Sequence, residues 1–527
     1  MRLSRRSFLA LSAATVAACA GDEAADDTTA PGSSEAPSTT ETPTTTASTV
    51  PPTTTVPPTS APTSSAPSTE LAADPFTLVV ASGDPDQGSV VLWTRLSGPL
   101  PDDGIDVDWE IVDDGGALLA AGTARTDQAM GGAVHVVAAI PGPGEFVFRA
   151  GGFESTVGRT GPIGETDEFR IAAASCQNYE AGHYAAYRDL AGWGPDLVVF
   201  LGDFIYEGAA GAPQAVRLHE GPEPTDLTGY RARYATYLSD PQLQAARAAC
   251  PWLVVWDDHE VENNYAGLVS QDDADPEQFA RRRQMAYRAW WEHTPTRLPP
   301  PGDVGTDYPI HRGIDVGELV RISALDGRQH RSDQVCEATL ELGAPCAGWD
   351  DPDRTMLGAD QEAWIADRFA TSTARWNCLA QQTVLSDLRF PGTGAILNYD
   401  QWDGYHPARE RLLATAPPDL VTLTGDIHLS GVGTLTAGDA PVGVEFVTTA
   451  ISSRANVEPS LQPVVAALPN IVDAELVSRG YTRHTVTPDR WTAEYRAVDD
   501  VTDADSDVST WKTFTVDRGS TTVTADG

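Results

Sequence analysis

Four apolar segments of the chain end in a side chain that can bind a metal ion. The segments are Phe169–Cys176, Asp196–Asp203, Trp252–Asp258 and Asp419–Asp426. Short apolar runs of this kind are typical of central strands that are buried on both faces of a sheet. In open α/β sheets the ligand site lies beyond the carboxyl ends of the strands, so we expect the four terminal side chains to converge. These side chains are Cys176, Asp203, Asp258 and Asp426.

Metal binding explains why so many charged groups stand at the ends of apolar strands. One Gly-Asp after a strand is often structural, but Gly202-Asp203 and Gly425-Asp426 occur together with the run Asp257-Asp-His-Glu260. Carboxylates at short range repel one another strongly unless cations neutralise them. The sequence therefore predicts a metal site, although Cys176 taken alone also fits a buried thiol.

The candidate ligands fall into two chemical sets. Hard oxygen donors suited to calcium, magnesium or manganese are Asp203, Asp258, Asp426 and the amides of Asn263 and Asn264. The thiolate, phenolate and imidazole of Cys176, Tyr206 and His428 instead favour a trivalent or softer transition ion such as iron. Tyr206 follows Asp203 by three residues, so one turn beyond the strand brings both to the same ion. The two sets together predict a mixed-metal site.

An all-β region precedes these segments. Short β-rich runs separated by turn clusters extend from Phe76 to about Arg159. The expected strands are Phe76–Ala81, Ser89–Leu96, Val107–Val112, Val134–Ile140 and Phe146–Ala150. Their spacing predicts a small immunoglobulin-like β-sandwich over residues 74–165, without chemistry of its own.

From Phe169 onward, apolar strands alternate with helical stretches, which predicts an α/β catalytic domain over residues 166–527. The expected helices are Tyr230–Leu238, Gln242–Ala249, Pro276–Trp291 and Gln361–Leu379. In the last one, Ile365, Phe369 and Trp376 form a stripe that we interpret as a packing face.

The N-terminus has the features of an export signal. Ser4-Arg-Arg-Ser-Phe-Leu9 is a twin-arginine motif, and the apolar stretch after it, Phe8–Ala18, is too short to span a bilayer. Val16-Ala-Ala-Cys19 matches a lipobox, which makes residues 1–18 a lipoprotein signal and Cys19 the lipidated first residue of the mature chain. Plain cleavage without a lipid is the alternative. The expected partners are the twin-arginine translocase and, through the lipid, the outer face of the cell membrane.

Residues 19–73 are rich in Ser, Thr, Pro and Ala, which predicts a disordered tether between anchor and domains.

The whole chain is strongly acidic. It has 527 residues, with 75 Asp and Glu against 35 Lys and Arg, and a formal net charge of -40. Nucleic-acid binding depends on basic patches, so this composition argues against it. We interpret the acids mainly as a means of keeping an exported protein soluble.

Three motifs resemble those of PhoD-type alkaline phosphatases, which are relatives of the calcineurin-like metallophosphoesterases. They are Gly202-Asp-Phe-Ile-Tyr206, Trp256-Asp-Asp-His-Glu260 with Asn263-Asn264, and Gly425-Asp-Ile-His428. The resemblance extends over nearly everything from Phe76 onward. It implies an α/β metallophosphoesterase sandwich, with central β-sheets flanked by helices, after a small N-terminal β-sandwich domain.

The resemblance also implies an Fe3+ ion and up to two Ca2+ ions. The iron ligands would be Cys176, Asp203, Tyr206 and His428, with Asp203 bridging to calcium. The calcium side would be served by Asp258, Asp426 and the pair Asn263–Asn264.

Four residues are candidates for contacts with the substrate, and two of them, His259 and Arg328, are also the candidate catalytic residues. His259 stands where related enzymes keep a histidine near the scissile oxygen, so it is the candidate acid or phosphate contact, with a structural role as the alternative. Arg328 and Arg331 can bind phosphate oxygens bidentately, and structural ion pairing explains them equally well. Asn264 completes the expected substrate side. Gly327 and His330 depart from the Thr and Tyr of the family motif.

The expected activity is hydrolysis of phosphate esters, on small molecules or wall polymers, by a metal-bound hydroxide that attacks phosphorus. A phospholipase D-like phosphodiesterase on the same scaffold is one alternative. A non-catalytic surface lipoprotein is another, but it leaves the ligand set unexplained. Of the remaining cysteines, Cys336 and Cys346 are ten residues apart and can pair after export, and Cys250 with Cys378 is a further pairing to test.

Overall fold

The computed structural model describes residues 70–272, 274–336, 345–390, 394–396 and 398–526. The predicted signal over residues 1–18, the lipidation site Cys19 and nearly all of the tether lie outside the described residues. Those expectations therefore stay predictions. Within the described ranges, no helix has both the length and the apolar character needed to cross a membrane.

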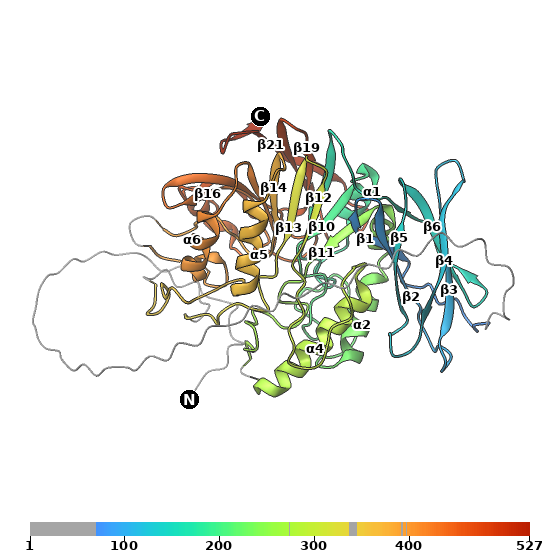
Figure 1. Ribbon diagram of the computed structural model, residues 1–527. Helices are drawn as coiled ribbons and strands as arrows, with labels where there is room; N and C mark the ends of the chain where they lie inside the picture. Colours follow the sequence, from blue (N-terminus) through green and yellow to red (C-terminus); the bar gives the residue numbers. More distant parts are fainter. Residues whose placement is uncertain (1–69, 273, 337–344, 391–393, 397, 527) are drawn as a thin grey trace, which may run out of the picture. The chain divides into compact units, whose positions relative to one another are not determined.

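The largest sheet has ten strands and joins the N-terminal segment to the catalytic one (Figure 1). In pairing order its strands are β22 (Val523–Asp526), β21 (Val508–Asp517), β20 (Arg490–Val498), β19 (Arg479–Val486), β9 (Phe169–Ala174), β10 (Leu197–Phe200), β11 (Pro251–Val254), β1 (Val80–Asp86), β2 (Ser89–Arg95) and β5 (Ala133–Ala139). β9, β10 and β11 are parallel neighbours. Their carboxyl ends therefore meet at one edge of the sheet.

A second sheet of seven strands supplies the other half of the catalytic core. Its strands are β12 (Arg312–Val316), β13 (Val320–Ala324), β14 (Trp376–Ala380), β15 (Leu420–Thr424), β17 (Ala440–Val447), β16 (Ser430–Ala437) and β18 (Ile471–Glu475). β13, β14 and β15 run parallel. One apolar core holds Ala172 and Val198 of the first sheet together with Ile322 and Val421 of the second. The two sheets thus pack on each other, and the predicted sandwich architecture is confirmed.

The N-terminal β-sandwich shares a sheet with the catalytic part. Its second sheet consists of β4 (Leu118–Thr126), β3 (Ile105–Val112), β6 (Gly144–Ala150), β7 (Phe153–Glu154) and β8 (Gly158–Thr160). Its first sheet is β1, β2 and β5, and β1 pairs in parallel with β11, where Gly83 lies opposite Trp252. A Cβ at Gly83 would collide with the carbonyl oxygen of Pro295. Glycine at this position therefore permits the close junction.

Helices cover the sheets, and some of them begin at an aspartate cap. The helices are α1 (Ala185–Trp193), α2 (Leu227–Leu238), α3 (Pro241–Ala249), α4 (Pro276–His293), α5 (Ala359–Ala370), α6 (His406–Ala414) and α7 (Gln462–Val465), with short 3-10 turns η1 (Trp402–Tyr405) and η2 (Pro459–Leu461). Asp226, Asp240 and Asp275 accept backbone N–H groups at the starts of α2, α3 and α4. α2 and α4 pack side by side, and α5 and α6 lie against the seven-stranded sheet (Figure 1).

One predicted helix, Gln361–Leu379, is wrong in its second half. α5 ends at Ala370, and Trp376–Ala380 forms β14, a fully buried strand between β13 and β15. Trp376 packs edge-on against Trp491 at 5.8 Å instead of extending the helical stripe. The polar run after Ala370 ends the helix, and five buried residues in succession suit a central strand.

The cysteine predictions had mixed outcomes. Cys336 and Cys346 form a disulfide with their Cα atoms 6.1 Å apart. Cys250 and Cys378 are both buried and free, so their predicted pairing is wrong. Cys250 caps the end of α3 directly before β11, and Cys378 lies inside β14, where a thiol acts as a small buried hydrophobe.

Candidate metal centre

The predicted strand ends converge between the two sheets. Cys176, Asp203 and Asp258 follow β9, β10 and β11, and Asp426 follows β15 of the other sheet. Three groups of ligand atoms each lie within 4.8 Å of one another. The groups are Cys176–Asp203–His428, Asp203–Asp258–His259 and Asp257–Asp258–Asp426. Because Asp203 belongs to the first two groups and Asp258 to the last two, the groups form one continuous centre.

The backbone at this centre is strained. Nine described residues other than glycine have a positive φ, and five of them belong to the site. The five are Cys176, Asp203, Asn264, Asp426 and His428, with φ between 55° and 60°. Left-handed conformations at side-chain-bearing residues cost free energy and concentrate at functional sites. The strained residues thus lie in the segments that carry the candidate ligands.

The residue before Asp203 must be a glycine for a steric reason. Gly202 has a φ of 106°, and a Cβ there would collide with Asp257. The Gly-Asp motif thus allows two adjacent strand ends, after β10 and β11, to approach closely.

Tyr206 joins the thiol side of the centre. Its Oη donates to Asp203 Oδ2 at 2.7 Å and lies 3.1 Å from His428 Nε2. His428 Nδ1 lies 2.6 Å from the Arg454 carbonyl oxygen, which only accepts, so Nδ1 carries the hydrogen. Burial lowers the pKa of His428 to about 3, so its ring is neutral and presents the Nε2 lone pair to the site. Ser453 Oγ also lies 2.7 Å from Tyr206 Oη.

The electrostatics of these groups fit a cation. Burial, and next the neighbouring Asp203, raise the pKa values of the Cys176 thiol and the Tyr206 phenol well above their ordinary ranges. Burial also raises the pKa of Asp203 well above its usual value. Asp203 Oδ1 and Asp257 Oδ2 are buried without a hydrogen-bond partner in the described parts of the chain. Buried oxygens with no donor, beside a thiol and a phenol, are what a metal ion satisfies.

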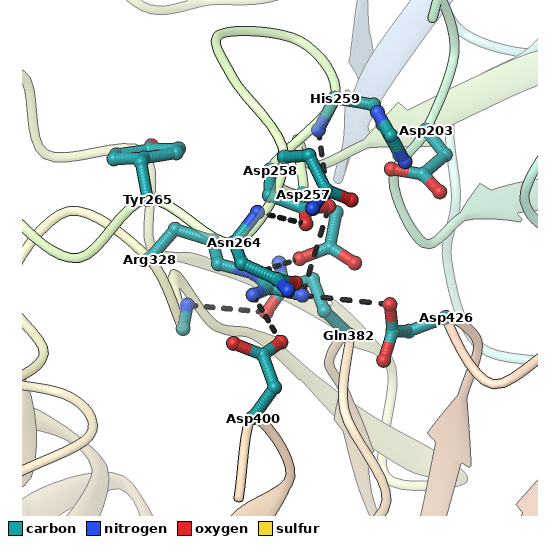
Figure 2. A network of polar contacts seen from close by, with 12 residues as sticks. Asp203, Asp257, Asp258, His259, Asn264, Tyr265, Arg328, Gln382, Asp400 and Asp426 are labelled. Carbon is teal, nitrogen blue, oxygen red and sulfur yellow. Dashed lines mark hydrogen bonds and ion pairs between the residues drawn. The ribbon is translucent and has the colours of Figure 1, made fainter. Parts of the chain in front are cut away.

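The carboxylate side surrounds Arg328 (Figure 2). Burial raises the pKa of Asp426 to about 6. Burial also raises the pKa of Asp258, but Arg328 and His259 outweigh it and the net pKa is lowered. Asn264 donates its backbone N–H to Asp258 Oδ2 at 2.6 Å. Its side chain extends over the cluster of carboxylates (Figure 2).

Asn263, predicted as a metal ligand, is placed differently from Asn264. Its side-chain Nδ2 donates to Gln271 at 2.5 Å, and its backbone N–H donates to Glu207 at 2.8 Å. The Asn263 amide nitrogen is thus engaged with Gln271, whereas the Asn264 backbone is bonded to Asp258.

The two arginines, for which phosphate binding and structural ion pairing were both open, are engaged in ion pairs within the protein. Arg328 is fully buried, bonds to Asp257 and Asp400, and its Nη2 lies 3.5 Å from Asp426 Oδ1. Arg331 donates to Asp400 Oδ1 at 2.6 Å and to the carbonyl oxygen of Asn264 at 3.0 Å. Their donors are thus engaged within the protein, which favours the ion-pairing alternative over phosphate binding. Asp400, which holds both, was missed in the sequence.

His259 lies at the exposed side of the centre. Its ring Nδ1 lies 2.6 Å from Glu207 Oε2, and its side chain is 20% exposed. Burial alone lowers the pKa of His259, but Glu207 and two further carboxylates outweigh it and raise that pKa well above its ordinary value.

Two residues of the centre, Glu207 and Asp257, were not among the predicted site residues. Glu207 directly follows the predicted ligand Tyr206, and Asp257 directly precedes Asp258. Asp257 belongs to the acidic run after the apolar segment, whereas adjacency to a predicted ligand was the only sequence signal for Glu207.

Comparison with known proteins agrees with this geometry. Residues 171–495 match the model of the PhoD-like phosphatase family, and residues 61–163 match that of the PhoD-like phosphatase N-terminal domain. Alkaline phosphatase D of Bacillus subtilis (strain 168) is 37% identical over 479 residues, which cover 85% of this chain and 82% of that protein. A solved structure of PhoD superposes with a TM-score of 0.82 at 35% identity, covering 87% of this chain and 93% of the other. The chain therefore belongs to the PhoD-like phosphatase family and is a hydrolase of phosphoric esters.

Proposed function

We propose that the chain is a metal-dependent phosphoesterase that holds iron(III) and calcium side by side. The ligands proposed for iron are Cys176, Asp203, Tyr206 and His428. The ligands proposed for calcium are Asp203, Asp258, Asp426 and Asn264. A thiolate, a phenolate and an imidazole suit iron, and a set made only of oxygens suits calcium.

The position of Asp203 is the observation that carries this proposal. It belongs to both the thiol group and the His259 group of ligand atoms. Its Oδ2 accepts from Tyr206, and its Oδ1 is buried with no partner among the described residues. A carboxylate that belongs to both groups of ligand atoms, with one oxygen unpartnered, is suited to bridge two cations.

The metal ions and the protein side chains have different roles in the proposed reaction. When bound, the cations neutralise charge on the phosphoryl oxygens and lower the pKa of water. Asp203 and Asp258 would hold the ions, and His259 lies within reach of both carboxylates with its side chain partly exposed. From that position His259 contacts an oxygen of the substrate, either on the phosphate or on the leaving group.

Chelation tests the metal requirement. We expect a calcium chelator to abolish hydrolysis of nitrophenyl phosphate by the purified protein, and added calcium to restore it. Asp203→Asn should stay inactive after calcium is added. Asp473→Asn is the control, because Asp473 pairs with Lys512 outside the centre. Full activity in excess chelator, or in Asp203→Asn, would contradict the proposal.

We propose both monoesters and diesters as substrates, from small molecules or wall polymers. Rates on nitrophenyl phosphate, on bis(nitrophenyl) phosphate and on phosphatidylcholine vesicles separate this proposal from a phospholipase D-like activity. We expect the two aryl esters to be turned over faster than the lipid. A higher rate on the lipid would favour the phospholipase alternative.

We also propose that the protein is exported by the twin-arginine route and anchored outside the cell through a lipid on Cys19. The Arg5-Arg6 motif and the lipobox support this location, and so does the disulfide between Cys336 and Cys346, since such bonds persist in oxidising compartments. Cys19→Ser should release the protein from the membrane fraction, and replacing Arg5 and Arg6 with Lys should retain it in the cytoplasm. Membrane association in Cys19→Ser would exclude the lipid anchor.

A further inference from the structure

The backbone of Asn264 is held from both sides in a strained conformation. Asn264 has a φ of 55°, and a left-handed conformation of this kind costs a residue other than glycine about 1–3 kcal/mol. Its N–H donates to Asp258 Oδ2 at 2.6 Å, and its carbonyl oxygen accepts from Arg331 Nη2 and Gln334 Nε2, each at 3.0 Å. Such strain persists only where the surroundings over-determine it. These contacts therefore hold the residue whose side chain extends over the carboxylates (Figure 2).

The Gln334 side chain joins Asn264 to the buried ion pairs. Its Nε2 donates to the Asn264 carbonyl oxygen and, at 2.8 Å, to Asp400 Oδ1. An amide nitrogen carries two hydrogens, so both bonds can form at once. Asp400 is buried and pairs with Arg328 and Arg331, which makes it a fixed acceptor. The bond to Asp400 thus keeps the Gln334 amide oriented toward Asn264.

The segment that carries Gln334 is itself tied down on each side. Two residues earlier, the backbone N–H of Ser332 donates to the Thr355 carbonyl oxygen at 2.9 Å. Two residues later, Cys336 is bonded to Cys346. A side chain on a backbone anchored at both ends has little conformational freedom left to lose when it binds a partner. Gln334 is therefore well placed to hold another segment in position.

We propose that Gln334 is a positioning residue that fixes Asn264 on the calcium side of the centre and so strengthens calcium binding. This inference rests on the proposed phosphoesterase function, in which Asn264 is a calcium ligand. Arg331 shares the same acceptor, but it also pairs with Asp400 and donates to the Tyr265 carbonyl oxygen. Gln334 is half-buried and uncharged, so its amide can be removed without leaving a buried ion unpaired.

Calcium binding to Gln334→Met tests this role. Methionine has a similar length and no donor, so the Asn264 carbonyl oxygen keeps only Arg331. Residues that support a metal ligand in this way typically change metal affinity about 10–100-fold when they are replaced. Because one donor remains, we expect the calcium dissociation constant, measured by equilibrium dialysis against chelator-buffered calcium, to rise on the order of 10-fold.

Gln242→Met is the matched control. Gln242 is also half-buried, and its amide donates to the Ala504 carbonyl oxygen at 2.7 Å, outside the centre. This variant should bind calcium like the wild type. An equal loss of calcium affinity in both variants would overturn the proposal, because it would show a general effect of losing a buried amide.

A second variant separates positioning of Asn264 from an effect through Asp400. Asn264→Gly removes the side-chain amide and adopts a positive φ without strain, so it should weaken calcium binding on its own. Adding Gln334→Met should raise the dissociation constant no further, because no side chain is left to position. A further rise as large as that in Gln334→Met alone would overturn the proposal, since Gln334 would then act through Asp400.

The remaining outcomes distinguish this inference from the function on which it rests. The iron content of Gln334→Met should equal that of the wild type, because the proposed iron ligands belong to the thiol side of the centre. An unchanged calcium dissociation constant, or a parallel loss of iron and calcium, would overturn the positioning role. If the wild-type protein binds no calcium, it is the proposed function that fails.

Discussion

Arg328 Nη1 and Asp400 Oδ2 lie 2.5 Å apart in the interior of the protein, between segments that follow strands β13 and β14. The same guanidinium also bonds to Asp257, at the end of β11 in the other sheet. One buried cation therefore holds together the strand ends of both sheets on the carboxylate side of the centre. Arg328 is thus engaged in ion pairs on the carboxylate side of the centre.

Arg328→Met should be strongly destabilising. It leaves Asp257 and Asp400 buried without their partner, and breaking a buried ion pair in this way costs about 3–5 kcal/mol. Urea unfolding of the variant measures the loss. Arg490→Met removes an exposed pair with Asp517 and should unfold like the wild type. Equal stability of Arg328→Met and the wild type would show that the buried network contributes nothing.

Tyr206→Phe should change the colour of the protein. A phenolate bound to iron(III) gives a charge-transfer band in visible light, and phenylalanine lacks the oxygen that makes it. We expect the band to disappear in Tyr206→Phe and to persist in Tyr179→Phe, where the ring lies beside Tyr237 instead. A band unchanged in Tyr206→Phe, or absent from the wild-type protein, would remove Tyr206 from the iron ligands.

Asp403 gives the free energy of unfolding a pH dependence. Burial, with Asp387 nearby, raises the pKa of Asp403 to about 7. An aspartate in the unfolded chain has a pKa of about 3.9, so between these values the folded state holds a proton that the unfolded state has lost. Stability should therefore fall as the pH rises from about 4 to about 7.

Asp403→Asn should flatten this dependence and stabilise the protein above about pH 7, because the neutral amide keeps an acceptor for the Leu388 N–H. Urea unfolding across the pH range measures both slopes. Asp526→Asn on the exposed last strand should keep the wild-type slope. An unchanged slope in Asp403→Asn would contradict the assignment.

The disulfide should contribute measurable stability. Cys336 and Cys346 are separated by ten residues, and closing a loop of this size stabilises a protein by about 2–3 kcal/mol. Replacing both with Ser should lower the free energy of unfolding by that amount. A reducing agent should lower the stability of the wild type and leave the double variant unaffected. A wild type that is insensitive to reduction would show that the bond is absent in solution.

Site residues could be predicted from the sequence where the pattern that indicates them lies in the same segment as the residues themselves. Each apolar run ended in a reactive side chain, so Cys176, Asp203 and Asp426 were found from local pattern alone. The parallel strands β9 and β10 bring Cys176 and Asp203 to one sheet edge, and the packing of the two sheets brings Asp426 to the same centre. Helix α4 was also predictable from local pattern, because its cap Asp275 and the Pro at its start lie next to its apolar face.

The errors arose where the deciding partner is distant in sequence. Asp400 acquires its role from Arg328, 72 residues earlier, and Glu207 from His259, 52 residues later. No local pattern indicates such pairs. Strand β4 was missed because its small residues, such as those around Gly122, lack the β-branched and aromatic side chains that favour strands.

The metal content of the purified full-length protein, compared with that of Asp203→Asn, tests the central claim most directly. The proposed bridge predicts about one iron and at least about one calcium per chain in the wild type, and a loss of both ions in the variant. Loss of both is the signature of a bridging ligand, since a ligand to one ion would release that ion alone. A wild-type protein without iron or calcium, or a variant that keeps both, would contradict the account.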